Sequence, residues 1–182
     1  MKQAIIKRKE KTYEDNEAIS SVLNYIYRLN TNKKLPLYCY GLNTYSNIPR
    51  FNSGMVPNTF NELLKILYLR PRNETIISDL SPNLIHLVVG FHDTKITPED
   101  TYLINAIAYT FADEFRVCFS IHNEPYNKNA HIVVCTSNIP HPDKPLTSKL
   151  LNEVYYPRIK ALAKMYNYKL NFVKDDERYE YS

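Results

Sequence analysis

Apolar residues recur at helical spacing in four stretches of the chain. The clearest begins at Thr97, a suitable N-cap, with Pro98 at the first helical position and two acidic residues after it, and its apolar face continues to Phe115. The other predicted helices cover residues 14–29, residues 57–71 and residues 146–166, the last with an interruption at Pro157. Each helix has an apolar face that can cover a sheet.

Short apolar runs rich in β-branched and aromatic residues predict strands between these helices. They cover residues 3–9, 35–41, 83–91, 116–122, 130–137 and 169–173. The fourth and fifth runs are separated by only a few residues, so they must pair as antiparallel strands. The order of elements predicts an α+β fold, with an antiparallel or mixed β-sheet of about five strands covered by helices, in a single domain. We expect this domain to span residues 1–174, and residues 175–182 to form a frayed tail.

Composition narrows the class of protein. With 182 residues, 44% hydrophobic and 23% charged, the chain is expected to be a soluble globular protein. It has no apolar run of the roughly 18 residues that a membrane helix needs, and its basic N-terminus lacks the apolar segment of a signal peptide. We therefore expect a cytoplasmic protein without a membrane partner. The three cysteines lack a paired spacing and are expected to be free thiols, and the net charge of +4 is compatible with a nucleic-acid partner.

The stretch IHNEPYNKNAHIVV brings polar residues together at a predicted hairpin. With residues 125–128 as a four-residue loop, His122 is expected opposite His131, and Glu124 opposite Asn129. All four side chains would lie on one face, because residues two apart in a strand share a face. Two imidazoles, a carboxylate and an amide in one patch indicate a divalent-metal site. The alternative is an ordinary polar hairpin end without metal.

The spacing of these four residues, His-x-Glu-x4-Asn-x-His, resembles the third motif of the relaxases, the mobilisation nucleases of conjugative plasmids in the HUH endonuclease superfamily. The family motif reads roughly H-x-D-x4-H-x-H, so Glu124 and Asn129 are departures from it. Residues 18–34 resemble the first motif, in which a helix carries the nucleophilic tyrosine and a basic loop follows, and residues 40–43 resemble the short strand after it. The likeness covers most of residues 18–138, in the family's order.

This resemblance implies metal-dependent nicking and rejoining of single-stranded DNA at an origin of transfer, for mobilisation of a plasmid or another mobile element by conjugation. Tyr25 matches the nucleophile, which would form a 5′-phosphotyrosyl intermediate, and Tyr27 is the alternative. The implied metal ligands are His122, Asn129 and His131, and the implied ion is Mn²⁺ or Mg²⁺. The implied partners are single-stranded DNA at the origin and accessory mobilisation proteins.

Several further residues receive roles from the same resemblance. Glu124 is expected either as a catalytic fourth ligand or as an acceptor that fixes a histidine tautomer. His86 stands where relaxases often have a histidine, and is expected either to support the metal ligands from outside or to be a satisfied core residue. Lys33, Lys34 and Arg50 are expected to contact DNA phosphates.

Three other functions stay open. The first is a relaxase-derived DNA-binding protein without turnover, because Asn129 stands where the family has a metal ligand. The second is a rolling-circle replication initiator of the same superfamily. Initiators place the nucleophilic tyrosine downstream of the histidine motif, so Tyr25 favours the relaxase order, although Tyr155, Tyr156 and Tyr166 do lie downstream. The third is an α+β protein that binds no metal.

Overall fold

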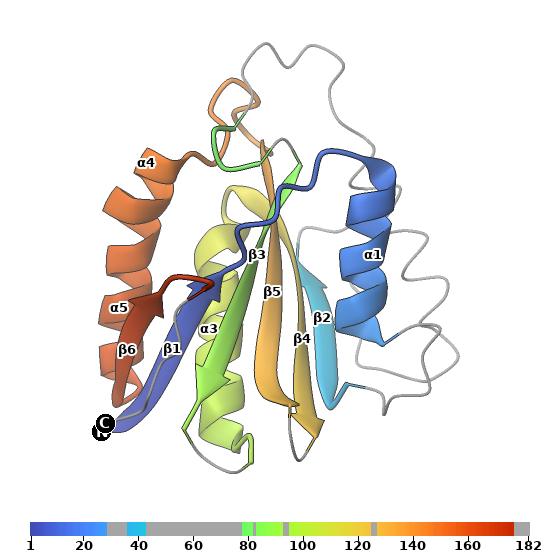
Figure 1. Cartoon of the computed structure of the whole chain (residues 1–182). Helices are drawn as coiled ribbons and strands as arrows, with labels where there is room; N and C mark the ends of the chain where they lie inside the picture. The colour runs from blue at the N-terminus through green and yellow to red at the C-terminus, as the bar shows by residue number, and fades with distance from the viewer. Residues whose placement is uncertain (29–35, 43–77, 82, 93–94, 125–126, 177–182) are drawn as a thin grey trace.

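A mixed sheet forms the centre of the part of the chain that the structure describes (Figure 1). The computed structural model describes residues 1–28, 36–42, 78–81, 83–92, 95–124 and 127–176. In these residues the sheet has six strands, in the order β2-β4-β5-β3-β1-β6. The strands are β1 (Lys2–Arg8), β2 (Tyr38–Leu42), β3 (Leu84–Phe91), β4 (Phe115–Glu124), β5 (Asn127–Asn138) and β6 (Tyr168–Val173).

Strand directions make this a mixed sheet. Every neighbouring pair is antiparallel except β1 and β6, which run parallel. The predicted α+β fold, with a mixed sheet in a single domain, is therefore confirmed. The described sheet has six strands rather than about five because the segments nearest both ends of the chain pair into it.

Helices cover both faces of the sheet. Helix α1 (Asn16–Tyr27) lies on one face, and α3 (Pro98–Ala112) and α5 (Tyr156–Met165) lie on the other (Figure 1). Alternation along the strands divides the core accordingly. Ile132 in β5 belongs to the larger core under α3 and α5, whereas its neighbour Val133 belongs to the smaller core under α1. The four predicted site residues of the β4–β5 hairpin, His122, Glu124, Asn129 and His131, share the α1 face.

The start of α3 follows the predicted capping chemistry. The Thr97 hydroxyl accepts a hydrogen bond from the Asp100 amide at 3.3 Å, and the Asp100 carboxylate accepts one from the Thr97 amide at 2.7 Å. Asp100 is fully buried, where it also accepts a hydrogen bond from the Tyr168 hydroxyl and lies 3.7 Å from the Lys2 ammonium. One carboxylate therefore ties α3 to both β1 and β6.

The predicted interruption at Pro157 is wrong, because the helical chain runs on from Ser148 to Met165. It consists of α4 (Ser148–Leu150), a π-helical segment η1 (Leu151–Tyr155) and α5. Proline lacks an amide N–H and its ring clashes with the carbonyl four residues earlier in an α-helix. The wider turn before Pro157, in which the Tyr156 amide bonds to the Leu151 carbonyl, accommodates the ring without a break.

Other predictions about the chain have separate outcomes. The predicted helix at 57–71 and the side chain of Cys39 lie outside the described residues. Cys118 and Cys135 are buried free thiols, as predicted, and burial raises the pKa of the Cys118 thiol to about 12. Among the described helices, none has the length and apolar character needed to cross a bilayer.

The predicted tail begins with a residue that is held in place. The Lys9 ammonium donates a hydrogen bond to the Asp175 carboxylate at 2.6 Å, and the Glu10 amide lies 3.4 Å from the other carboxylate oxygen. Residues 177–182 lie outside the described residues.

Replacing Asp100 with alanine tests how much this carboxylate stabilises the fold. We expect Asp100→Ala to lower the free energy of unfolding by about 2–3 kcal/mol, because a buried hydroxyl, an amide and an ammonium lose their acceptor. Glu99→Ala is the matched control, since Glu99 is exposed and lies 3.9 Å from the same ammonium. Urea denaturation of both variants measures the difference. Equal midpoints for the two variants would contradict the role given to Asp100.

Candidate active site

The β4–β5 hairpin has a register that differs from the predicted one. The observed pairs are His122 with Asn129, Ser120 with His131, and Glu124 with Asn127. The predicted pairing of His122 with His131 is wrong, because β5 begins at Asn127, two residues earlier than we assumed. A shift of two residues preserves the alternation of a strand, so the four predicted side chains still share one face.

The two hairpin histidines lie diagonally across the strand pair and are both buried. The ring centroids of His122 and His131 are 4.6 Å apart, and each side chain is 1% exposed. Asn129 is half-buried, and its amide oxygen has no hydrogen-bond partner among the described residues. Glu124 lies at the rim of this face, with its side chain 26% exposed.

Helix α1 brings one of the two candidate tyrosines to these histidines. Tyr25 is 44% exposed, and its ring meets His131 edge-on at a centroid distance of 5.1 Å and His122 at 6.1 Å. Tyr27, two residues later, is 2% exposed and packs in the core under α1. Of the two tyrosines, Tyr25 therefore has both the histidine contacts and the access to solvent that a nucleophile needs.

Arg28 is a site residue that the sequence reasoning missed. It follows α1 in the left-handed conformation, at φ 59° and ψ 33°, and its amide caps the helix by bonding to the carbonyls of Asn24 and Tyr25. Its side chain is 1% exposed, and a guanidinium nitrogen lies 3.1 Å from a Glu124 carboxylate oxygen and 3.2 Å from Nδ1 of His122. A basic residue after a helix is common, so the sequence carried no distinctive signal for this position.

The guanidinium fixes the tautomer of His122. Arginine stays protonated in proteins, so Arg28 donates and Nδ1 of His122 accepts. Nε2 of His122 then carries the proton and donates it to the Ile26 carbonyl at 2.8 Å. Both ring nitrogens of His122 are therefore engaged by the end of α1.

A chain of hydrogen bonds leads from Tyr13 to His131. The Tyr13 hydroxyl lies 3.3 Å from Nδ1 of His86, and Nε2 of His86 lies 2.9 Å from Nδ1 of His131. Nε2 of His131 is buried and has no hydrogen-bond partner among the described residues. The structure thus places His86 directly against a predicted ligand, as a supporting residue requires.

Burial keeps this chain of groups neutral. Desolvation, followed by the charge of Lys9, lowers the pKa of His86 to about 4. Desolvation also lowers the pKa of His131 well below its usual value, with further contributions from His86, His122 and Arg28. The pKa of Tyr13 is raised to about 12, chiefly by burial, so its hydroxyl keeps its proton. At neutral pH the two imidazoles are uncharged, and the guanidinium of Arg28 carries the positive charge of the site.

In this arrangement only part of the predicted ligand set is open to a metal ion. His122 has no free ring nitrogen, and a guanidinium already lies against it and against Glu124. His131 and Asn129 each keep a buried atom that could bind a ligand. Within the described residues, no group of three His, Cys, Asp or Glu side chains has metal-binding geometry. The Mn²⁺ or Mg²⁺ ion stays a prediction, and the chemistry proposed for this site uses the chain's own groups.

A cavity of about 330 Å³ opens beside Tyr25. It is also lined by His86 and by Lys9, Lys11 and Asp175. Lys9 is ion-paired with Asp175, so Lys11 is the cation of this lining that suits the phosphates of a nucleic acid. The predicted phosphate contacts Lys33, Lys34 and Arg50 lie outside the described residues.

Comparisons of the chain with protein-family models, with curated proteins and with solved structures find no match. They assign no family. The relaxase resemblance therefore rests on the sequence motifs, and the functional argument rests on the geometry of Tyr25, Arg28 and the histidines.

A double-mutant cycle tests the Arg28–Glu124 pair. We expect Glu124→Gln to lower the free energy of unfolding by about 2 kcal/mol, because it leaves a buried guanidinium without its counter-charge. Arg28→Met in the same chain removes that charge, so the double variant should be more stable than the sum of the single effects predicts, by about 1 kcal/mol or more. Urea denaturation of the four proteins measures the coupling. Strictly additive effects would show that the two side chains do not interact.

The free energy of unfolding should decrease as the pH falls from about 6.5 to about 4, because burial lowers the pKa of His86 in the folded protein. In this window the unfolded histidine binds a proton and the folded one does not, so protons favour unfolding, by at most about 1.4 kcal/mol per pH unit for one group. His86→Gln should flatten this dependence, whereas His141→Gln, at an exposed position, should not. Urea denaturation at several pH values measures both. An unchanged slope in His86→Gln would contradict a buried neutral His86.

Proposed function

We propose that this chain cleaves and rejoins single-stranded DNA, with Tyr25 as the nucleophile. The observation that carries the proposal is a half-exposed tyrosine whose ring contacts two buried histidines and lies 5.5 Å from a buried guanidinium. A nucleophile, hydrogen-bonding groups and a positive charge are what phosphodiester transfer needs in one place. Lys11 of the adjoining cavity supplies charge for the DNA backbone.

The reaction balances without an oxidant or a further co-reactant. The Tyr25 oxygen attacks phosphorus and forms a phosphotyrosyl bond to the phosphate that stays on the 5′ end of the downstream product strand. The bond from phosphorus to the 3′-oxygen breaks, that oxygen gains a proton, and the tyrosine proton leaves to solvent. The free 3′-hydroxyl can later attack the phosphotyrosyl bond and rejoin the strand, so bond energy is conserved.

Two groups of the site can stabilise the phosphate as negative charge builds on it. In one of the two neutral tautomers of His86, the Tyr13 hydroxyl donates a hydrogen bond to Nδ1 of His86, and Nε2 of His86 donates one to Nδ1 of His131. His131 then presents Nε2–H, a buried donor without a partner among the described residues, to a phosphate oxygen. Arg28, which is hydrogen-bonded to His122, adds a full positive charge to the same face. Fixed donors and charges in a buried site favour the transition state because they need little reorganisation.

The positions of the downstream tyrosines support the relaxase order over that of a replication initiator. Tyr155 is 1% exposed in the core under α3 and α5, and Tyr156 packs against the same core. Tyr166 is 42% exposed at the C-terminal end of α5. All three belong to the helices on the opposite face of the sheet from His122 and His131. Cleavage at an origin of transfer, with accessory mobilisation proteins as partners, is the biological setting that the motif resemblance supports.

Binding without turnover is the second candidate, and two features favour it. Asn129 stands where the resembling motif has a histidine, and Arg28 lies where that motif implies an ion. In this case the cavity beside Tyr25 would hold single-stranded DNA without cutting it.

A covalent-adduct assay separates the two candidates. We expect the purified protein, incubated with single-stranded oligonucleotides, to form a protein–DNA adduct that resists denaturation, because the 5′-phosphotyrosyl bond is covalent. Tyr25→Phe should abolish the adduct. Tyr102→Phe is the matched control, since Tyr102 is 61% exposed on α3, and it should leave the adduct unchanged. Denaturing gel electrophoresis with labelled DNA measures the yield.

Two outcomes count against cleavage by Tyr25. DNA binding without an adduct, across many oligonucleotide sequences, would establish the second candidate. An adduct of equal yield in Tyr25→Phe would assign the nucleophile to another residue.

A further inference from the structure

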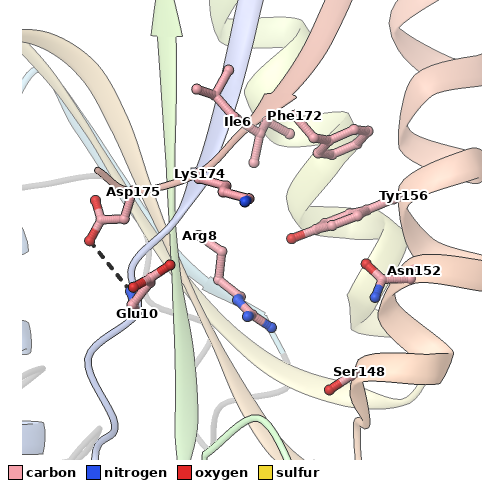
Figure 2. Close-up of a pocket in the computed structure, with 10 residues that line it drawn as sticks. Ile6, Arg8, Glu10, Ser148, Asn152, Tyr156, Phe172, Lys174 and Asp175 are labelled. Atoms are coloured by element: carbon pink, nitrogen blue, oxygen red, sulfur yellow. Dashed lines mark hydrogen bonds between the residues drawn. The ribbon is translucent and has the colours of Figure 1, made fainter. Parts of the chain in front are cut away.

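A second cavity, of about 440 Å³, lies on the α5 side of the sheet, at the end of β1 and β6 (Figure 2). Ile6 and Arg8 of β1 form one wall, and Asn152 of η1 and Tyr156 of α5 form the facing wall. Ile6 belongs to the core under α3 and α5, so this cavity opens on the opposite face from His122 and His131. It lies within the size range of small-molecule sites.

Arg8 is the main charged group of this cavity. Among the described residues its guanidinium makes no hydrogen bond or ion pair, although the side chain is half-buried. Figure 2 shows it extending from β1 into the space in front of Asn152 and Ser148. Arg8 and Tyr156 line the same cavity, and the charge of Arg8 opposes the rise that burial causes in the pKa of Tyr156. A half-buried guanidinium without a partner is a donor group available to an anion.

Two more donors reach the same space. The Tyr156 hydroxyl points toward β1, and the Lys174 ammonium points into the space between Tyr156 and β1 (Figure 2). The Tyr156 ring stacks on Phe172 at a centroid distance of 4.0 Å, which holds the hydroxyl in position. Asn152, in the π-helical segment, adds an amide, and such segments often occur at functional sites.

The acidic residues of the cavity do not cancel its positive charge. Asp175 lines the cavity, but its carboxylate accepts hydrogen bonds from the Lys9 ammonium and the Glu10 amide. The nearby Asp79 carboxylate accepts two hydrogen bonds from Ser148, which lower its pKa, and the charge of Arg8 lowers that pKa further. The exposed Glu10 carboxylate is the remaining acid of the lining. The cavity therefore favours an anion that can take several hydrogen bonds at once.

We propose that this cavity binds a phosphate group, carried by a nucleoside monophosphate. A guanidinium can bind two phosphate oxygens at once, and an ammonium, a phenol and an amide can satisfy the remaining ones. The volume leaves room for a nucleoside beside the phosphate. A phosphate of a DNA strand has the same chemistry, and Asp175 also lines the cavity beside Tyr25, so a strand is the alternative source. The proposal goes beyond strand cleavage and does not depend on it.

Binding of deoxyadenosine monophosphate and of inorganic phosphate to the whole chain tests the site. By calorimetry, we expect the wild type to bind the nucleotide and Arg8→Met to bind it at least about tenfold more weakly. Arg158→Met is the matched control, because Arg158 is exposed on α5 and does not line the cavity, and it should bind like the wild type. The nucleotide should also raise the thermal midpoint of the wild type but not of Arg8→Met. Similar midpoints of the two proteins without nucleotide establish that Arg8→Met is folded.

The possible outcomes answer three questions independently: whether the cavity binds phosphate, which molecule carries that phosphate, and whether Tyr25 cleaves DNA. Binding of 5′-phosphorylated oligonucleotides through Arg8 supports the phosphate site and assigns its phosphate to a DNA strand. Absence of binding by all three probes, or equal binding by Arg8→Met and the wild type, overturns the proposal. Arg8→Met should still form the Tyr25 adduct. Phosphate binding and strand cleavage can therefore be tested separately, and failure of one is distinguishable from failure of the other.

Discussion

The buried charge of Arg28 is the constraint on which the rest of the candidate site depends. A guanidinium with 1% exposure must be paired, and Glu124 and His122 pair it. These contacts join the end of α1 to β4, and they hold Tyr25 over the hairpin histidines. The left-handed backbone of Arg28, which is costly for a residue with a Cβ, is offset by the helix cap and by this ion pair.

That pairing also divides the histidines by role. Both ring nitrogens of His122 form hydrogen bonds to groups at the end of α1, so the role of His122 is structural. His131 is supported from behind by His86 and Tyr13 and keeps Nε2 for a ligand. The opposite face of the sheet carries a second cationic group, Arg8, whose guanidinium has no partner among the described residues. We infer that the two faces serve different ligands, a reacting strand and a bound phosphate.

Hydrophobic spacing predicted most of the described helices and strands, and the capping signal at Thr97 predicted the start of α3. Local pattern failed where geometry depends on one or two residues. The register of the hairpin depends on where β5 begins, which the apolar pattern did not reveal. The helix continues through Pro157 because of a π-helical turn, which the pattern did not reveal either. Arg28 could not be found because its partners lie 94 and 96 positions away in the sequence. Only the tertiary fold decides whether such a residue is solvated or buried.

The central claim is that Tyr25 reacts beside a resident guanidinium. Mass spectrometry of the protease-digested protein, after reaction with an oligonucleotide in the presence of a metal chelator, tests it most directly. The claim predicts a nucleotide attached to the peptide that contains Tyr25, and loss of this product in Arg28→Met. A modified peptide that lacks Tyr25, or a product that forms only when Mn²⁺ or Mg²⁺ is added, would contradict it.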